Sequence, residues 1–192
     1  RTYVLVDGYE RVAALDAIAA DFVTAVVIEE PLADVLVLSH RLDESGSRSA
    51  LEEGWLLDLL VREHGVTQRD LALRLGRSPS WVSRRLSLVQ VLPDSVQRAV
   101  REGRIPSHAA EKYLVPLART NRSSCNTIVT SLGRERVSDR DVQRLYDVWR
   151  AGTETERSAV EASPILALRI CTRRAAQSGG EPARLVRDPD TI

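Results

Sequence analysis

The 192-residue sequence contains no methionine and only two cysteines, Cys125 and Cys171. Two cysteines so far apart supply neither a disulfide framework nor a zinc site, and they agree with a reducing cytoplasm. No apolar run is long enough for a transmembrane helix, which excludes a membrane-spanning protein. The chain starts at Arg1 without a signal peptide, and we expect it to be a fragment of a longer protein.

Lysine is also scarce, because Lys112 is the only lysine among 27 basic residues. Arginine suits two-point contacts to guanine and phosphate, although a codon bias would give the same excess. The net charge is zero, but the charges are unevenly distributed. Residues 1–61 carry 4 basic and 12 acidic side chains, whereas residues 62–122 carry 12 basic and 5 acidic ones. The basic segment is suited to neutralising several phosphates of a nucleic acid.

The sequence lacks a compact group of acidic residues and histidines with metal-ligand spacing. His40, His64 and His108 are far apart in the chain, and no set of Asp, Glu and His resembles the metal site of a nuclease. We therefore assign no catalytic residue and no metal ligand. Nuclease activity is disfavoured.

Residues 67–88 have the pattern of a helix-turn-helix. Thr67, with an aspartate three residues later, resembles a capping box at the start of a first helix. Gly76 supplies the permissive backbone that a tight turn between two helices needs. Ser78 is a preferred N-cap, and Pro79 fits the first position of a second helix. The spacing predicts two short helices joined by a tight turn.

The second helix, expected from Pro79 to about Leu88, has a buried and an exposed side. Val82 and Leu86 are four residues apart and face inward. The exposed side near its N-terminal half corresponds to the part of a recognition helix that enters the major groove of DNA. The residues on that side are Ser80, Ser83 and Arg84.

An ordinary αα-hairpin with a solvated arginine face has the same spacing, so spacing alone does not establish DNA contact. Arg77, Arg84 and Arg85, however, flank serines and do not alternate with carboxylates, as they would on a helix stabilised by its own ion pairs. Together with the basic charge of the surrounding segment, this pattern favours DNA binding. Trp81 falls beside apolar positions, and we interpret it as a core or edge aromatic and not as a base-stacking residue.

The segments before residue 50 alternate between strand and helix patterns. Residues 3–6 and 24–28 are β-prone and flank an alanine-rich helical pattern over residues 10–20, which predicts a strand, helix, strand unit. A further helix is expected over residues 32–42. The Ser- and Gly-rich loop at residues 43–49 is the candidate domain boundary.

Beyond that loop every pattern is helical, so we predict a mainly α fold in which a helix-turn-helix domain follows a small α/β piece. The expected helices outside the helix-turn-helix cover residues 50–64, 94–102, 107–114 (stopped at Pro116), 121–133, 139–150 and 154–174 (interrupted at Pro164). The expected domains are residues 1–44, the α/β piece; 45–120, the DNA-binding domain; 121–176, a C-terminal helical extension; and 177–192, a disordered tail.

Residues 3–118 resemble the ParB/KorB family of partition proteins. The resemblance is strongest over residues 67–93, where a glutamine-led first helix, A-x-x-x-G-x-S, V-S-x-x-L and a leucine-rich stretch ending in L-P follow in order. It continues through E-G-R-I at residues 102–105 and H-A at residues 108–109. The matching residues of the first part are Gln68, Ala72, Gly76, Ser78, Val82, Ser83, Leu86, Leu88, Leu92 and Pro93.

The resemblance implies that the helical domain binds a specific DNA site, usually an inverted repeat, as a homodimer. It also implies that the α/β piece belongs to a domain that holds CTP with magnesium and closes as a clamp around DNA, together with a ParA-like partner ATPase. The family's G-E-R-R-x-R-A motif, which cradles the triphosphate, occurs here at residues 8–14 with only Gly8, Arg11 and Ala14 retained. Glu10 stands where the family has an arginine, which adds repulsion for the phosphates.

The sequence therefore predicts a ParB-type, sequence-specific DNA-binding protein of a prokaryotic cytoplasm, associated with the nucleoid or a plasmid and acting in partition or in control of a mobile element. The alternatives are a CTP-dependent DNA clamp with CTPase activity and a nucleotide-independent transcriptional repressor. Gly8 and Arg11 are the candidate nucleotide-binding residues. The candidate DNA-binding residues are Thr67, Gln68, Arg77, Ser78, Ser80, Ser83, Arg84, Arg85 and Arg104. Pro79 stands where the family often has arginine. Because proline offers no hydrogen-bond donor to a base, we expect base recognition to depend on the residues around it.

Overall fold

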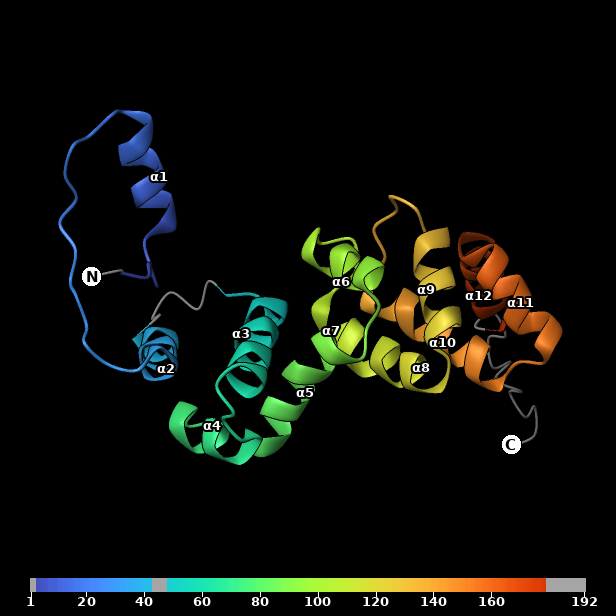
Figure 1. Ribbon diagram of the computed structural model, residues 1–192. Coiled ribbons are helices and arrows are strands. Elements are labelled where there is room, and N and C mark those ends of the chain that lie inside the picture. The colour runs from blue at the N-terminus through green and yellow to red at the C-terminus, as the bar shows by residue number, and fades with distance from the viewer. Residues whose placement is uncertain (1–2, 43–47, 179–192) are drawn as a thin grey trace, which may run out of the picture. The chain divides into compact units, whose positions relative to one another are not determined.

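A computed structural model describes residues 3–42 and 48–178, and these are mainly α-helical (Figure 1). The chain divides into two compact units between Val91 and Leu92. This division falls inside the domain expected over residues 45–120, so the predicted domain limits are not the limits of the compact units. Most of the boundary loop expected at residues 43–49, and all but two residues of the expected tail, lie outside the described residues.

The first unit contains five helices among its described residues. They are α1 (Tyr9–Ala17), α2 (Leu32–Leu42), α3 (Ala50–Arg62), α4 (Gln68–Leu75) and α5 (Pro79–Gln90). Helices α3 and α5 make the most extensive contact, and α4 packs on both α5 and α2 (Figure 1). Arg74 of α4 forms an ion pair with Asp34 of α2, which links these two helices.

One apolar core holds α2 to α5 together. Its fully buried members come from all four helices, and each buried leucine contributes about 1.5–3 kcal/mol relative to an exposed one. The buried residues of this core are Val37, Leu57, Leu60, Leu71, Ala72, Val82 and Leu86. Helix α3 begins with a complete capping box, in which Ser49 and Glu52 exchange hydrogen bonds.

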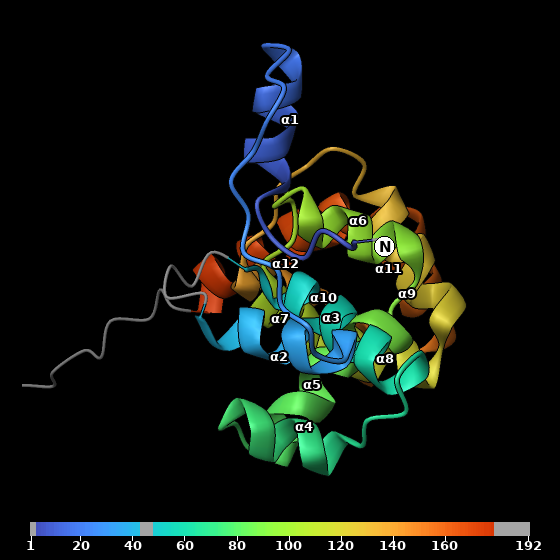
Figure 2. The same ribbon diagram turned by 60° about the vertical axis from the view of Figure 1, so that its left-hand side comes forward.

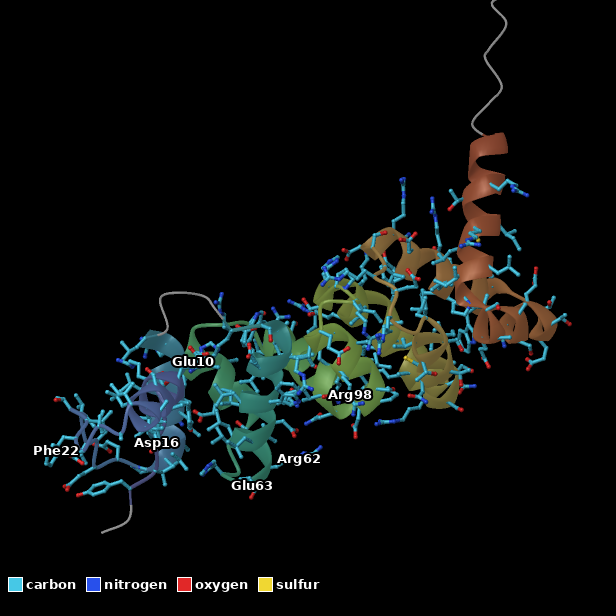
Figure 3. All side chains as sticks on the ribbon, turned by 90° about the horizontal axis from the view of Figure 1, so that it is seen from above. Glu10, Asp16, Phe22, Arg62, Glu63 and Arg98 are labelled. Atoms are coloured by element: carbon cyan, nitrogen blue, oxygen red, sulfur yellow. The ribbon has the colours of Figure 1, made fainter. Side chains whose placement is uncertain are left out.

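The strands expected at residues 3–6 and 24–28 are not formed. Within residues 3–42 and 48–178 the structure has no β-strand, and α1 is the one regular element that the expected strand, helix, strand unit contains. A strand satisfies its backbone groups only by pairing with a neighbouring strand, so β-prone sequence alone does not create one. Val26 is 89% exposed and Phe22, labelled in Figure 3, is 90% exposed, so these segments bury little apolar surface.

The second unit is also helical throughout its described residues. It comprises α6 (Asp94–Arg101), α7 (Ser107–Ala109), the π-helical segment η1 (Ala110–Leu114), α8 (Val115–Thr120), α9 (Arg122–Ser131), α10 (Asp139–Ala151), α11 (Glu154–Ala162) and α12 (Pro164–Ser178). Helix α9 packs on α6, α8 and α11, while α10, α11 and α12 pack on one another (Figures 1 and 2). The prediction of a mainly α fold is confirmed.

Candidate nucleic-acid interface

Residues 67–79 form the local structure that the sequence predicts for a helix-turn-helix. The Thr67 hydroxyl accepts a hydrogen bond from the Asp70 amide at 3.1 Å, which caps α4. Gly76 ends α4 in the left-handed region, with φ of 63°, where a residue with a side chain would be strained. The Ser78 hydroxyl then accepts from the Trp81 amide at 3.1 Å and starts α5, with Pro79 in its first turn.

Helix α5 is fixed by the burial of one face. Val82 and Leu86 are 0% and 1% exposed in the core of the first unit, as the sequence predicts. On the same side, Gly54 of α3 lies so close to α5 that a Cβ atom there would be 2.7 Å from the Arg85 carbonyl oxygen. This close approach explains why a glycine stands in the middle of α3, and it sets the distance between α3 and the helix expected to read DNA.

The opposite face of α5 is exposed and carries no carboxylate. Ser80, Ser83 and Arg84 lie on it, in the N-terminal half of the helix. Thr67, Gln68, Arg77 and Ser78 are exposed as well, at the start of α4 and in the turn. Seven of the nine candidate DNA-binding residues are thus exposed on α4, its N-cap, the turn and α5. The size, polarity and charge of this surface suit the edges of bases and the phosphates of DNA.

Arg85 is placed differently from its neighbour Arg84. Its side chain is 21% exposed, and its Nε atom donates to Glu53 Oε2 of α3 at 2.6 Å. His40 Nε2 of α2 lies 3.7 Å from the other Glu53 oxygen. Arg85 therefore joins α5 to α3 and α2 and does not project from the exposed face. Sequence reasoning missed Glu53, because its partner lies 32 residues away and no local spacing connects them.

The Glu53 carboxyl has an altered pKa. Burial acts to raise the pKa, but the nearby His40 ring and the Arg85 guanidinium, which donates a hydrogen bond to the carboxylate, outweigh burial and hold the pKa below its ordinary value of 4.5. The carboxylate is therefore charged at neutral pH and stabilises the folded state. This contribution is present above pH 4.5 and is lost as the pH falls through the lowered pKa.

We expect Glu53→Gln to lower the free energy of unfolding by about 1–2 kcal/mol at neutral pH, because it leaves Arg85 without its charged partner. The difference from the unsubstituted chain should shrink as the pH falls well below 4.5 and Glu53 itself becomes protonated. Urea denaturation at neutral and at acidic pH measures this. Glu63→Gln, at the exposed end of α3 (Figure 3), is the matched control and should have little effect. An equal loss at both pH values would contradict the assignment.

Arg104 belongs to the second unit, whereas α4 and α5 belong to the first. Its side chain is 19% exposed, its Nε atom donates to Glu102 at 2.8 Å, and its Nη1 atom donates to the Gly133 carbonyl oxygen at 2.8 Å. These contacts tie the turn after α6 to the turn after α9. The structure thus gives Arg104 a structural task, and its predicted DNA contact stays a prediction.

The candidate nucleotide-binding residues lie at the start of α1, which buries none of its residues. Gly8 has φ of 81°, and the Arg11 guanidinium lies 3.6 Å from the Asp7 carboxylate, with both side chains about 80% exposed. No second basic residue of the G-E-R-R-x-R-A type accompanies them, because positions 10 and 13 hold Glu10 and Ala13. Nucleotide binding here stays a prediction.

Other kinds of site are not found in the described part of the chain. No group of three or more His, Cys, Asp or Glu side chains there is arranged to hold a metal ion. Cys125 and Cys171 are free, and burial raises the pKa of the Cys125 thiol to about 12, which makes that thiol a poor nucleophile. None of the described helices has the length and apolar character needed to cross a membrane.

Comparison with known proteins identifies the family. The model of the ParB HTH domain matches residues 47–149. Over 118 residues, 60% of this chain and 39% of the relative, the chain is 34% identical to a nucleoid occlusion protein of Bacillus pumilus. Stage 0 sporulation protein J and the nucleoid occlusion protein of Bacillus subtilis are each 30% identical over 74% of this chain, covering 50% and 51% of their own lengths. The chain thus spans about half the length of these relatives or less, and it belongs to the ParB HTH domain family.

Proposed function

We propose that this chain binds a specific double-stranded DNA site through the α4–α5 helix-turn-helix, with α5 in the major groove. The single observation that carries this proposal is the two-sided character of α5. One face is locked into the core by Val82 and Leu86, while the other presents serines and arginine without any carboxylate. A helix so fixed can hold side chains against base edges with little loss of entropy on binding.

The exposed residues divide into two roles by position. Ser80, Ser83 and Arg84 lie where a recognition helix meets base edges, so we assign them to base recognition. Thr67, Gln68, Arg77 and Ser78 lie at the start of α4 and in the turn, and we assign them to phosphate contacts that fix the helix on the duplex. Arg85 supports α5 through Glu53 and belongs to neither set.

The relatives are named for nucleoid occlusion and for stage 0 of sporulation. We infer that this chain acts on nucleoid or plasmid DNA in partition, as a homodimer on an inverted repeat and with a ParA-like ATPase as partner. A repressor would require the same DNA binding without the ATPase. A pull-down of the ATPase by the DNA-bound chain separates the two roles, because a repressor would capture none.

In vitro selection from random duplex DNA tests the proposal. We expect the chain to enrich one motif and to bind it at least about 1,000-fold more tightly than unrelated DNA at physiological salt. The logarithm of the binding constant should fall linearly with the logarithm of the salt concentration, because phosphate contacts release counterions. Fluorescence anisotropy with the selected and an unrelated duplex measures both quantities. Failure to enrich any motif would overturn the proposal.

A further inference from the structure

Trp81, in the first turn of α5, is the centre of a cluster of basic side chains that DNA binding as proposed does not explain. The guanidinium carbons of Arg77 and Arg85 each lie 5.3 Å from the centroid of its ring. The His40 ring meets it edge-on, with centroids 6.4 Å apart and an interplanar angle of 85°. The indole also packs against the apolar core. Its position is therefore fixed by the core, while its surface faces two arginines.

The two arginines differ in how their charge is balanced. Arg85 is held by Glu53 at 2.6 Å, so its charge is largely neutralised. For Arg77 the structure records no carboxylate partner among the described residues, and its guanidinium lies against the Trp81 ring. Two guanidiniums beside one ring, both without a balancing carboxylate, would repel each other. Glu53 thus makes it favourable for the ring to hold Arg77 as well.

Positive charge also surrounds Arg77 beyond the ring. A cavity of about 290 Å³ beside the turn is lined by basic side chains from three segments, and among the described residues that line it Glu53 is the acidic one. The basic members are His40, Arg41, Arg48 and Arg77. A guanidinium held rigidly in such surroundings, beside the exposed face of α5, is suited to a phosphate group of the DNA backbone.

We propose that Trp81 is a positioning residue, whose indole holds Arg77 in the turn for contact with a DNA backbone phosphate next to the bases that α5 reads. This inference rests on the proposed function. Arg77 makes the contact, Trp81 restricts its side chain before DNA arrives, and Glu53 neutralises Arg85 so that the ring can hold both arginines. The sequence interpretation of Trp81 as a core or edge aromatic is thereby extended, because the exposed side of the ring also holds Arg77.

The test compares Trp81→Leu, Arg77→Ala and the double variant by titrating binding to the selected duplex with salt. Trp81→Leu keeps apolar volume in the core but removes the cation–π contact. Arg77→Ala should weaken binding about 10-fold and reduce the salt slope by about one, the signature of one lost phosphate contact. Trp81→Leu should lose about 3- to 10-fold and part of the same slope. The double variant should bind no more weakly than Arg77→Ala.

Additive losses in the double variant, or an unchanged salt slope in Trp81→Leu, would overturn the inference. Trp55→Leu on the exposed side of α3 is the matched control and should keep both affinity and slope. If Trp81→Leu fails to fold, Trp81→Phe retains an aromatic ring with weaker cation binding and should give the same changes at smaller size. Failure of the unsubstituted chain to bind any selected site would overturn the proposed function instead, so the two failures are distinguishable.

Discussion

A Gly54→Ala variant is expected to lose about 1–2 kcal/mol of stability, although alanine is the better helix former. In the interior of a helix, replacing glycine by alanine gains up to about 1 kcal/mol from backbone entropy. At position 54 the added Cβ would lie 2.7 Å from the Arg85 carbonyl oxygen and 3.1 Å from Val89 Cγ1. The first contact is with backbone, which cannot rotate away, so α3 and α5 must move apart. Overpacking of this kind costs about 1–3 kcal/mol and outweighs the helix propensity.

Asparagine substitutions at Gly54 and Gly76 show whether the loss of stability comes from a clash with α5 or from the loss of glycine itself. Gly76→Asn places the side chain in open space at φ of 63°, a conformation that asparagine tolerates, and should cost less than about 1 kcal/mol. Gly54→Asn meets the Arg85 backbone and should cost more than Gly54→Ala. Urea denaturation measures all three variants. A Gly54→Ala chain that is more stable than the unsubstituted one would show that helix propensity dominates and that the α3–α5 contact is looser than the structure indicates.

The sequence predicts α4, α5 and the turn between them well because their signals are local. A threonine or serine cap forms its hydrogen bond three residues away, and the left-handed residue at the turn depends on its own φ alone. Thr67, Gly76 and Ser78 therefore occupy the predicted positions, and both caps form, although Thr67 and Asp70 make only one of the two hydrogen bonds of the expected capping box. The inward face of α5 was predictable for the same reason, since Val82 and Leu86 obey the period of one helix.

Features that depend on distant residues were not predictable. The β-prone runs at residues 3–6 and 24–28 find no partner strand among the described residues. In the sequence Gly54 indicates only a weak point in a helix, and its need for the absence of a side chain follows from the close approach of α5. Arg84 and Arg85 are adjacent and identical in type, and only the position of Glu53 shows that one is exposed and the other is committed to an ion pair.

At Pro116 the structure differs from the prediction for a local reason, which is the backbone geometry just before the proline. The sequence predicts that this proline stops a helix, yet the chain stays helical from Ser107 to Thr120. A π-helical segment, Ala110–Leu114, precedes the proline and places it in the first turn of α8. At that position its missing N–H is not required by the next helix, so the proline is tolerated.

Arg84→Ala is expected to weaken binding to the selected site about 10- to 100-fold and to relax base preference at the position that Arg84 reads, because one arginine on a guanine edge contributes about 1–3 kcal/mol. Binding to unrelated DNA should change far less. Arg84 is exposed, so the free energy of unfolding should stay within about 0.5 kcal/mol. Repeating the selection with the variant, and comparing its affinities for selected and unrelated duplexes, measures these effects.

The neighbouring Arg85 provides the matched control, because it forms an ion pair with Glu53 whereas Arg84 is exposed. Arg85→Ala removes the ion pair with Glu53 and leaves that carboxylate half-buried, so it should lower the free energy of unfolding by about 1–3 kcal/mol. Under conditions where it remains folded, it should select the same DNA motif as the unsubstituted chain. If instead Arg84→Ala keeps the original motif with unchanged affinity, the exposed face of α5 does not lie in the major groove, and the assignment of base recognition to Ser80, Ser83 and Arg84 is wrong.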